Sequence, residues 1–211
     1  MSRTSFHARL CLAAVAAAVL LGPPAAHAAK LRQQNLTRLI TDAEQIVAGK
    51  VTRVTDGVTD RGLPYTEITI AVADSARGEL RGGKPYTFRQ FGLLEPRKMP
   101  NGRMLVAVTP EGFPRWQQGE QVVAFLYRSA SRTGLQTTAG LAQGKLTVLN
   151  GRIANEFNNR GLFEGVKISD DLLTEKERAM LKSQGPVDAA TFVGLVGRAV
   201  NENWIAKGEM R

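Results

Sequence analysis

The sequence YTEITIAV, residues 65–72, is the clearest β-strand pattern in the chain. Ile68, Ile70 and Val72 fall on one face of an extended backbone, and the residues between them fall on the other. A period of two in hydrophobicity is typical of a strand with one buried face. The stretch therefore predicts a half-buried strand, and similar patterns lie on both sides of it.

These neighbouring patterns predict a series of short strands. Residues 121–127 are almost continuously apolar, as expected of a strand buried on both faces. Asn150-Gly151 favours the left-handed turn of a tight hairpin, and Asp56-Gly57 predicts a turn at the end of the first strand. The predicted strands are residues 46–54, 65–72, 86–91, 104–108, 121–127, 135–138, 146–149 and 152–157.

Three segments predict helices. Residues 30–43 are amphipathic with helical spacing. Thr174 and Glu177 have the spacing of a capping box, which predicts a helix over residues 175–183. Asp188 is the expected N-cap of a last helix. The buried stripe of that helix is expected to be Phe192, Leu195, Val196 and Ala199.

Together these elements predict one mainly β domain over residues 29–211, with no internal repeat or low-complexity linker. A meander of short strands most often closes into a small barrel or sandwich. The fold class that we predict is a small antiparallel barrel of the OB type, closed or partly open. It would carry one N-terminal helix and two C-terminal helices, the latter at about residues 172–204.

Residues 1–28 have the pattern of a cleavable signal peptide. Arg3 and Arg9 supply positive charge, and residues 10–21 form an apolar run that is too short for a bilayer core, which needs about 20 residues. A small-x-small site follows, so we expect cleavage within residues 26–30 and a mature protein without a transmembrane segment. The location would be periplasmic or secreted, and an uncleaved membrane anchor is the alternative.

Cleavage would remove every histidine and cysteine, because His7, His27 and Cys11 are the only ones in the chain. The mature protein would then have no disulfide, no Cys/His metal site and no imidazole or thiol for catalysis. We therefore expect no metal, no cofactor and no catalytic residues. Without Arg3 and Arg9, 26 basic and 19 acidic residues remain, a net charge of +7.

Four stretches together resemble a group of uncharacterised exported bacterial proteins. They are LITDAEQIVAGKVTRV, YTEITIAVADSARGEL, FPRWQQGEQVVAFLY and GLAQGKLTVLNGRI, within residues 36–157. The resemblance implies an OB-like barrel similar to netrin and tissue-inhibitor-of-metalloproteinase modules. Those inhibitors bind the zinc of their target through an N-terminal cysteine, which the mature chain would lack. The resemblance therefore implies a fold and no inhibitory residue.

The chain is most basic between Arg77 and Arg132, with ten basic and four acidic residues. Aromatic residues lie among these cations, and cations beside rings suit an anionic polymer, because charge attracts it and rings stack on it. The alternative, which we favour, is that the rings point inward as core and the arginines form a solvated outer face. The candidate binding residues are Arg81, Lys84, Arg89, Arg97, Lys98, Arg103, Arg115 and Trp116.

Other chemistries have less support in the sequence. The stretch from Gly78 to Lys84 resembles a P-loop, but Pro85 stands where that motif needs Ser or Thr. Asp170-Asp171, Glu175 and Glu177 are the densest acids, and paired carboxylates act in glycosidases. These acids also precede or begin a helix, where they complement its dipole, and we favour that structural role.

The predicted function is that of an exported, non-enzymatic binding or interaction module. Its partner would be an acidic envelope component, such as an anionic polymer or lipid surface, or another exported protein. Export argues against nucleic acid as the partner. The alternatives are a carboxylate-based hydrolase and an inhibitor of a secreted protease that presents the loop at residues 92–119.

Overall fold

A computed structural model of the chain describes residues 32–78, 83–99 and 101–211, so the predicted signal peptide lies outside the described residues. The strands are β1 Gln45–Val58, β2 Pro64–Arg77, β3 Pro85–Phe91, β4 Arg97–Lys98, β5 Met104–Leu105, β6 Gln121–Leu126, β7 Lys145–Leu149, β8 Arg152–Asn155 and β9 Val187–Asp188. The helices are α2 Leu36–Asp42, α3 Glu175–Leu181 and α4 Ala189–Asn201, with short 3₁₀ helices η1 Leu141–Gly144 and η2 Asp170–Leu172. Within these ranges no helix is long and apolar enough to cross a membrane.

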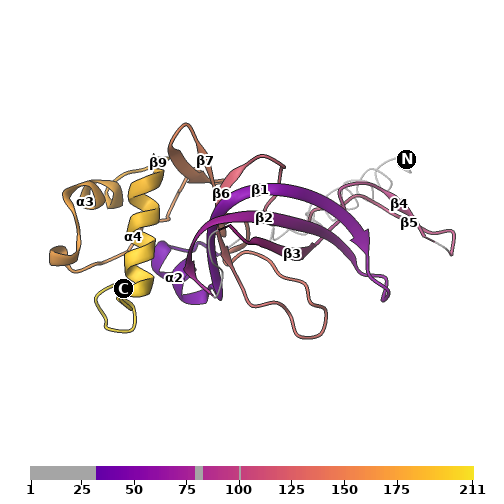
Figure 1. The fold of residues 1–211 in the computed structure, drawn as a ribbon, viewed down its shortest axis with the longest axis horizontal. Helices are drawn as coiled ribbons and strands as arrows, with labels where there is room; N and C mark the ends of the chain where they lie inside the picture. Colours follow the sequence, from indigo (N-terminus) through magenta and orange to yellow (C-terminus); the bar gives the residue numbers. More distant parts are fainter. Residues whose placement is uncertain (1–31, 79–82, 100) are drawn as a thin grey trace, which may run out of the picture. The chain divides into compact units, whose positions relative to one another are not determined.

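Seven strands form one antiparallel sheet in the order β3-β2-β1-β6-β7-β8-β9, and β4 and β5 form a separate hairpin. Figure 1 shows α3 and α4 at the β9 end of the sheet and the β4–β5 hairpin beyond the far end of β1 and β2. The predicted mainly β fold with one early helix and two late helices is confirmed.

The strand predicted at residues 65–72 lies within β2. Ile68 and Ile70 are fully buried and Val72 is 1% exposed, which confirms the predicted apolar face. β2 pairs with β1 on one side and with β3 on the other. Over residues 65–71, β2 is therefore paired along both edges, as a central strand requires.

β1 continues through the predicted turn at Asp56-Gly57 and ends only at Val58. Gly57 pairs with Tyr65 of β2, and a Cβ added at Gly57 would lie 2.5 Å from the hydroxyl oxygen of Tyr65. Glycine is thus needed here to make room for an aromatic ring and not to form a turn. The predicted end of this strand at residue 54 is therefore wrong.

β6 is buried on both faces, as its apolar run predicted. Val122, Ala124 and Leu126 face a core between β1, β2, β3 and β6. Val123 and Phe125 face a second core that α2, α3 and α4 cover. Because successive side chains of a strand point to opposite faces, β6 contributes to both cores.

Asn150-Gly151 joins β7 to β8, as predicted. The φ angles of the two residues are +50° and +73°, the left-handed values that a two-residue hairpin turn needs. β8 ends at Asn155 and not at Phe157, because the Asn155 Oδ1 atom accepts the backbone N–H groups of Phe157 and Asn159 at 3.0 and 2.9 Å. These two bonds turn the chain out of the sheet.

The first helix is shorter than the predicted range, residues 30–43. Asn35 is its N-cap, and the Asn35 Oδ1 atom accepts the backbone N–H group of Arg38 at 3.0 Å. α2 therefore begins at Leu36. An N-cap of this kind contributes about 1 kcal/mol to helix stability.

Both C-terminal helices begin at the predicted caps. Thr174 and Glu177 form the capping box of α3, and the carboxylate of Asp188 accepts the backbone N–H group of Thr191 at the start of α4. The predicted stripe of α4 is buried in the core: Phe192, Leu195, Val196 and Ala199.

The sheet is open at its ends, because β3 and β9 do not pair with each other among the described residues. The strand predicted at residues 135–138 is reduced to a single bridge between Leu126 and Thr138. The backbone N–H group of Gln136 donates to the carbonyl of Arg89 at 2.7 Å, and the Tyr86 hydroxyl donates to the Oε1 atom of Gln136 at 2.8 Å, so this segment contacts β3 without forming a regular strand. A closed OB-like barrel is therefore not confirmed.

Candidate functional site

The structure describes seven of the eight predicted binding residues and distributes them over four places; Arg81 lies outside the described residues. Three of them come together in the β4–β5 hairpin: Arg97, Lys98 and Arg103. The others lie in the turn before β3, on β3 and in the loop before β6: Lys84, Arg89, Arg115 and Trp116. The hairpin is therefore the one place where the described structure gathers the predicted cations.

We call residues 93–99 and 101–108 the β4–β5 extension. It follows β3, and at its base the backbones of Leu93 and Val108 exchange two hydrogen bonds of 2.8 and 3.0 Å. β5 is shorter than the predicted strand at residues 104–108, because regular pairing covers two residues of each arm. The extension is thus closed at its base and carries a short ladder farther out.

Cross-strand pairing assigns the side chains of the extension to two faces. Arg97 lies opposite Leu105, and Lys98 lies opposite Met104. Directly opposite residues of an antiparallel pair project to the same face of the ladder. One face therefore carries Arg97 and the half-buried Leu105, and the other carries Lys98 and Met104, both exposed.

Asp56 of β1 anchors the extension to the sheet. Its Oδ2 atom accepts the backbone N–H groups of Leu94 and Glu95 at 2.8 and 3.1 Å, and its Oδ1 atom lies 2.7 Å from the Nη2 atom of Arg97. Burial opposes ionisation of Asp56, but these backbone hydrogen bonds and Arg97 hold the pKa of its carboxyl below the usual value. The guanidinium group of Arg97 is therefore engaged in an ion pair with Asp56 within the protein.

Arg89 is also engaged within the protein. Its Nε atom lies 2.8 Å from the Oε2 atom of Glu67, and its guanidinium carbon lies 4.3 Å from the centre of the Tyr65 ring. The hydrogen bond to Glu67 raises the pKa of Arg89. Both side chains of this ion pair are partly exposed, so solvent screens the attraction between them. An anion from a partner can therefore compete with Glu67 for Arg89.

Trp116 does not lie on the surface, in contrast to its predicted place among the binding residues. It is 6% exposed, packs edge to face with Phe88 at 5.4 Å, and donates from Nε1 to the Oε1 atom of Gln90 at 3.2 Å. A ring enclosed in this way has no free face for stacking on a ligand. Phe88 is also buried, so these two rings follow the alternative interpretation, in which aromatic residues form core.

The sequence analysis did not single out Lys145, which is buried at the start of β7. The Lys145 Nζ atom donates to the carbonyl of Arg115 at 2.5 Å and to the Oε2 atom of Glu120 at 2.6 Å, and it lies 5.1 Å from the Trp116 ring centre. These contacts hold the loop before β6 against β7. A lysine that begins a strand is usually solvated, so no local pattern marks this role.

A cavity of about 490 Å³ lies between residues 157–164 and residues 181–185. Its lining includes Phe157, Arg160 and Lys182, and none of the predicted binding residues. A second cavity of about 310 Å³ is lined by Arg115 and Lys145 among others. Neither of these two cavities, both formed by described residues, is lined by residues of the β4–β5 extension.

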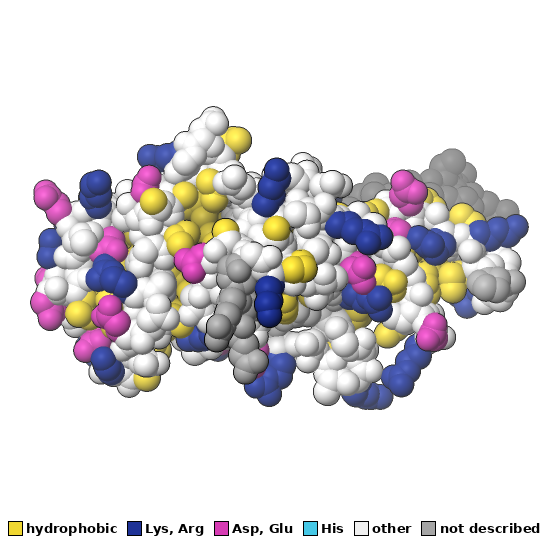
Figure 2. Space-filling view, in the orientation of Figure 1, with side chains coloured by type: hydrophobic (Ala, Val, Ile, Leu, Met, Phe, Trp, Pro, Cys, Tyr) yellow, Lys and Arg dark blue, Asp and Glu magenta, His cyan; other side chains and the backbone are white. Residues whose placement is uncertain are grey.

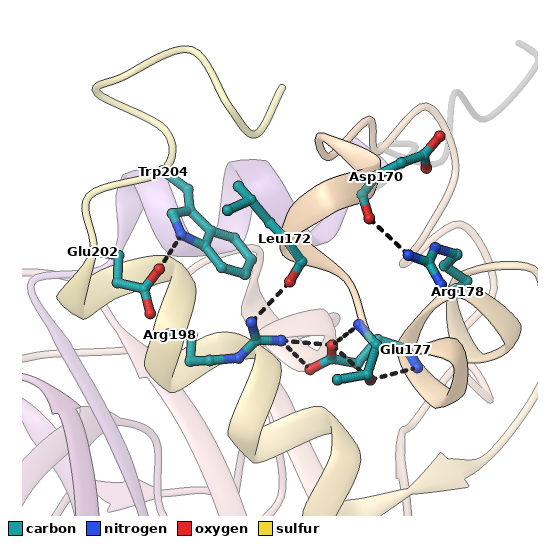
Figure 3. A network of polar contacts seen from close by, with 8 residues as sticks. Asp170, Leu172, Glu177, Arg178, Arg198, Glu202 and Trp204 are labelled. Carbon is teal, nitrogen blue, oxygen red and sulfur yellow. Dashed lines mark hydrogen bonds and ion pairs between the residues drawn. The ribbon is translucent and has the colours of Figure 1, made fainter.

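The four acidic residues at positions 170–177 differ in exposure and in their hydrogen-bond partners. Asp170-Asp171 are exposed in η2, and Glu175 is exposed at the start of α3, whereas Glu177 is 5% exposed. The Glu177 carboxylate accepts hydrogen bonds from the backbone and hydroxyl of Thr174. It also accepts hydrogen bonds from Arg198, as Figure 3 shows. Burial opposes ionisation of Glu177, but these donors hold the pKa of its carboxyl below the usual value. Glu177 thus has a structural role.

Neither metal-ligand geometry in the described residues nor similarity to known proteins indicates a function for the chain. Among the described residues, no group of three or more His, Cys, Asp or Glu side chains is arranged to hold a metal ion. In comparisons with known proteins, no family model, no curated protein and no solved structure matches the chain. The resemblance to exported bacterial proteins therefore stays a prediction.

Proposed function

We propose that the protein is a non-enzymatic binding module that contacts an acidic partner through the β4–β5 extension. The observation that carries this proposal is the grouping of three cations in one projecting hairpin: Arg97, Lys98 and Arg103. Arg97 is held by Asp56, whereas within the described ranges neither Lys98 nor Arg103 forms an ion pair. Two of the three charges are therefore free for a partner.

The surroundings of the extension favour attraction of an anion. Glu95 is the only acid in residues 93–108. Figure 2 shows Lys and Arg side chains around the end of the molecule that bears the extension, with hydrophobic atoms and some Asp and Glu side chains among them. Charges that project into water act over about 10 Å at 0.1 M salt. The extension therefore presents its positive charge to an approaching surface before other parts of the fold.

The proposal includes export to the periplasm or beyond and a partly open barrel of the OB type. The signal-peptide pattern of residues 1–28 supports export. The bond between Gln136 and the Arg89 carbonyl supports the barrel, because it connects the segment after β6 to β3 across the open side. Neither feature bears on which acidic partner is bound.

Heparin chromatography over a salt gradient tests the proposal, with heparin as a generic polyanion. Every element of the described fold lies within residues 32–211, so protein lacking residues 1–28 is used. The test variant is Lys98→Gln/Arg103→Gln. The matched control is Lys182→Gln/Lys207→Gln, which removes the same charge from exposed positions of the C-terminal part.

We expect the wild type to be retained and the test variant to elute at clearly lower salt than the control. Loss of two ion contacts lowers the slope of log affinity against log salt by about two for a polyanion such as DNA. Equal elution of the two variants would show that retention follows net charge alone. That result, or no retention at low salt, contradicts the proposal.

A further inference from the structure

The β4–β5 extension concentrates apolar surface as well as charge. Of the six large hydrophobic side chains that are exposed in the described residues, four belong to it: Leu94 at 46%, Met104 at 58%, Val106 at 70% and Val108 at 39%. Exposed apolar side chains that occur singly need no explanation, whereas a group of them marks a contact surface. The extension is too short to bury them against itself, since its ladder has two residues in each arm.

The apolar and the cationic side chains are interleaved on the same segment. Lys98 lies opposite Met104 and shares its face, and Arg103 immediately precedes Met104. On the other face, Arg97 is tied to Asp56. The exposed face therefore combines a free ammonium group with a flexible thioether side chain.

The extension is also pre-organised. The Leu93–Val108 bonds, the Asp56 carboxylate and the bond from the Met99 backbone N–H group to the Arg103 carbonyl at 2.8 Å hold its backbone in place. A contact surface that is ordered before binding loses little conformational entropy when its partner arrives. Its apolar side chains therefore stay exposed in the free protein and are not hidden by collapse of the loop.

The composition of this surface fits a lipid bilayer better than a protein. The centres of protein interfaces are enriched in aromatic residues, Met and Arg, and they are depleted in Lys. The extension shares Met and Arg with such interfaces, but it also exposes Lys98. The described extension contains aliphatic residues and Met but no aromatic residue. Aliphatic side chains that enter the acyl boundary, with Lys and Arg directed to anionic headgroups, are the arrangement by which peripheral proteins bind bilayers.

The geometry points to an anionic lipid surface as the partner of the β4–β5 extension, with Met104 and Val106 entering the bilayer interface and Lys98 and Arg103 contacting acidic headgroups. This inference rests on the proposed function and specifies its partner. It adds a requirement that charge alone does not impose: the apolar side chains must be present. Electrostatic attraction would bring the hairpin to the surface, and apolar burial would retain it there.

Vesicle flotation tests the inference, with the protein lacking residues 1–28. Vesicles of phosphatidylglycerol and phosphatidylcholine are compared with vesicles of phosphatidylcholine alone, at low and at physiological salt. The apolar variant is Met104→Ser/Val106→Ser and the cation variant is Lys98→Gln/Arg103→Gln. The control is Leu149→Ser, because Leu149 is 72% exposed and lies at the β7–β8 turn. Thermal unfolding establishes that each variant is folded.

We expect binding to the anionic vesicles and little to the neutral ones. The cation variant should bind roughly 25-fold more weakly, since each of the two cations is worth about fivefold near an anionic surface. The apolar variant should bind at least about tenfold more weakly while its elution from heparin stays unchanged, because heparin offers no apolar phase. The Leu149→Ser variant should bind as the wild type does.

Two results overturn the inference and leave the proposed function standing. One is retention on heparin without binding to anionic vesicles, which would assign the extension to an acidic polymer or protein. The other is vesicle binding by the apolar variant equal to that of the wild type or of Leu149→Ser. Absence of both heparin retention and vesicle binding contradicts the proposed function itself.

Discussion

Replacing Arg198 with methionine should destabilise the fold, because it leaves the buried carboxylate of Glu177 without its cation. The Arg198 Nη2 atom lies 2.6 and 2.5 Å from the two Glu177 oxygens, and its Nη1 atom donates to the Leu172 carbonyl at 2.8 Å. The guanidinium carbon also lies 5.0 Å from the Trp204 ring centre. Figure 3 shows how these contacts connect α3 with α4.

The size of the effect follows from the exposure of the two partners. Removing one partner of a fully buried pair costs about 3–5 kcal/mol. The Glu177 side chain is 6% exposed, but that of Arg198 is 37% exposed, so solvent screens part of the interaction. Thr174 also continues to donate to the Glu177 carboxylate. We therefore expect a loss of about 2 kcal/mol, which lowers Tm by roughly 4–8 °C for a domain of this size.

Urea and thermal unfolding, followed by circular dichroism, measure this loss. Arg178→Met is the control, because Arg178 is exposed and its side chain donates one hydrogen bond, to the Asp170 carbonyl. That variant should lose at most about 1 kcal/mol. The double variant Glu177→Gln/Arg198→Met removes the uncompensated charge and should be more stable than Arg198→Met alone. A free energy of unfolding for Arg198→Met within about 0.5 kcal/mol of the wild type would refute the reasoning.

The same pair predicts a pH dependence. The folded pKa of Glu177 lies below its unfolded pKa, so the folded state binds this proton less readily. The contribution to stability is therefore complete above the unfolded pKa of about 4.3 and is lost as pH falls through the depressed folded pKa. The stability difference between the wild type and Glu177→Gln should shrink on acidification below about pH 4, and a difference that is constant with pH contradicts this.

Two further predictions concern the core and the backbone. Trp116→Ala should lower the free energy of unfolding by about 3–5 kcal/mol, because the ring is buried against Phe88. Trp116→Phe should fold and elute from heparin as the wild type does. Reduced retention of that folded variant would show that Trp116 takes part in binding. Gly151→Ala should destabilise the protein by about 1 kcal/mol in urea unfolding, because φ is +73°. Gly194→Ala, in open space on α4, should stabilise it by about 0.5–1 kcal/mol, and effects of equal sign at the two glycines would contradict the assignment.

Features whose partners are close in the chain were predictable. Thr174 and Glu177 are three residues apart, and their capping box is present as expected. Asn150 and Gly151 are adjacent, and both have the positive φ that their turn needs. In each case the groups that interact lie within one turn of backbone, so residue type and spacing are sufficient to specify the geometry.

The place of the candidate site was predictable only in part. The basic character of the segment containing Arg97, Lys98 and Arg103 is a property of composition. The carboxylate that ties Arg97 is that of Asp56, 41 residues away, so sequence spacing gave no sign that one of these cations is engaged. Trp116 has the same sequence neighbourhood whether it faces water or core, and only packing with Phe88 places it inside.

The mainly β character, the starts of the two C-terminal helices and the β7–β8 turn were predictable from the sequence alone, because periodicity and capping act over a few residues. Tertiary contacts place the Tyr65 ring against Gly57, bury Lys145 and, within the described part of the chain, leave β3 and β9 unpaired with each other. Only the tertiary structure decided that cations and apolar side chains share one projecting hairpin. These outcomes depend on contacts between segments far apart in the chain, and the energy of such contacts exists only once the segments have met.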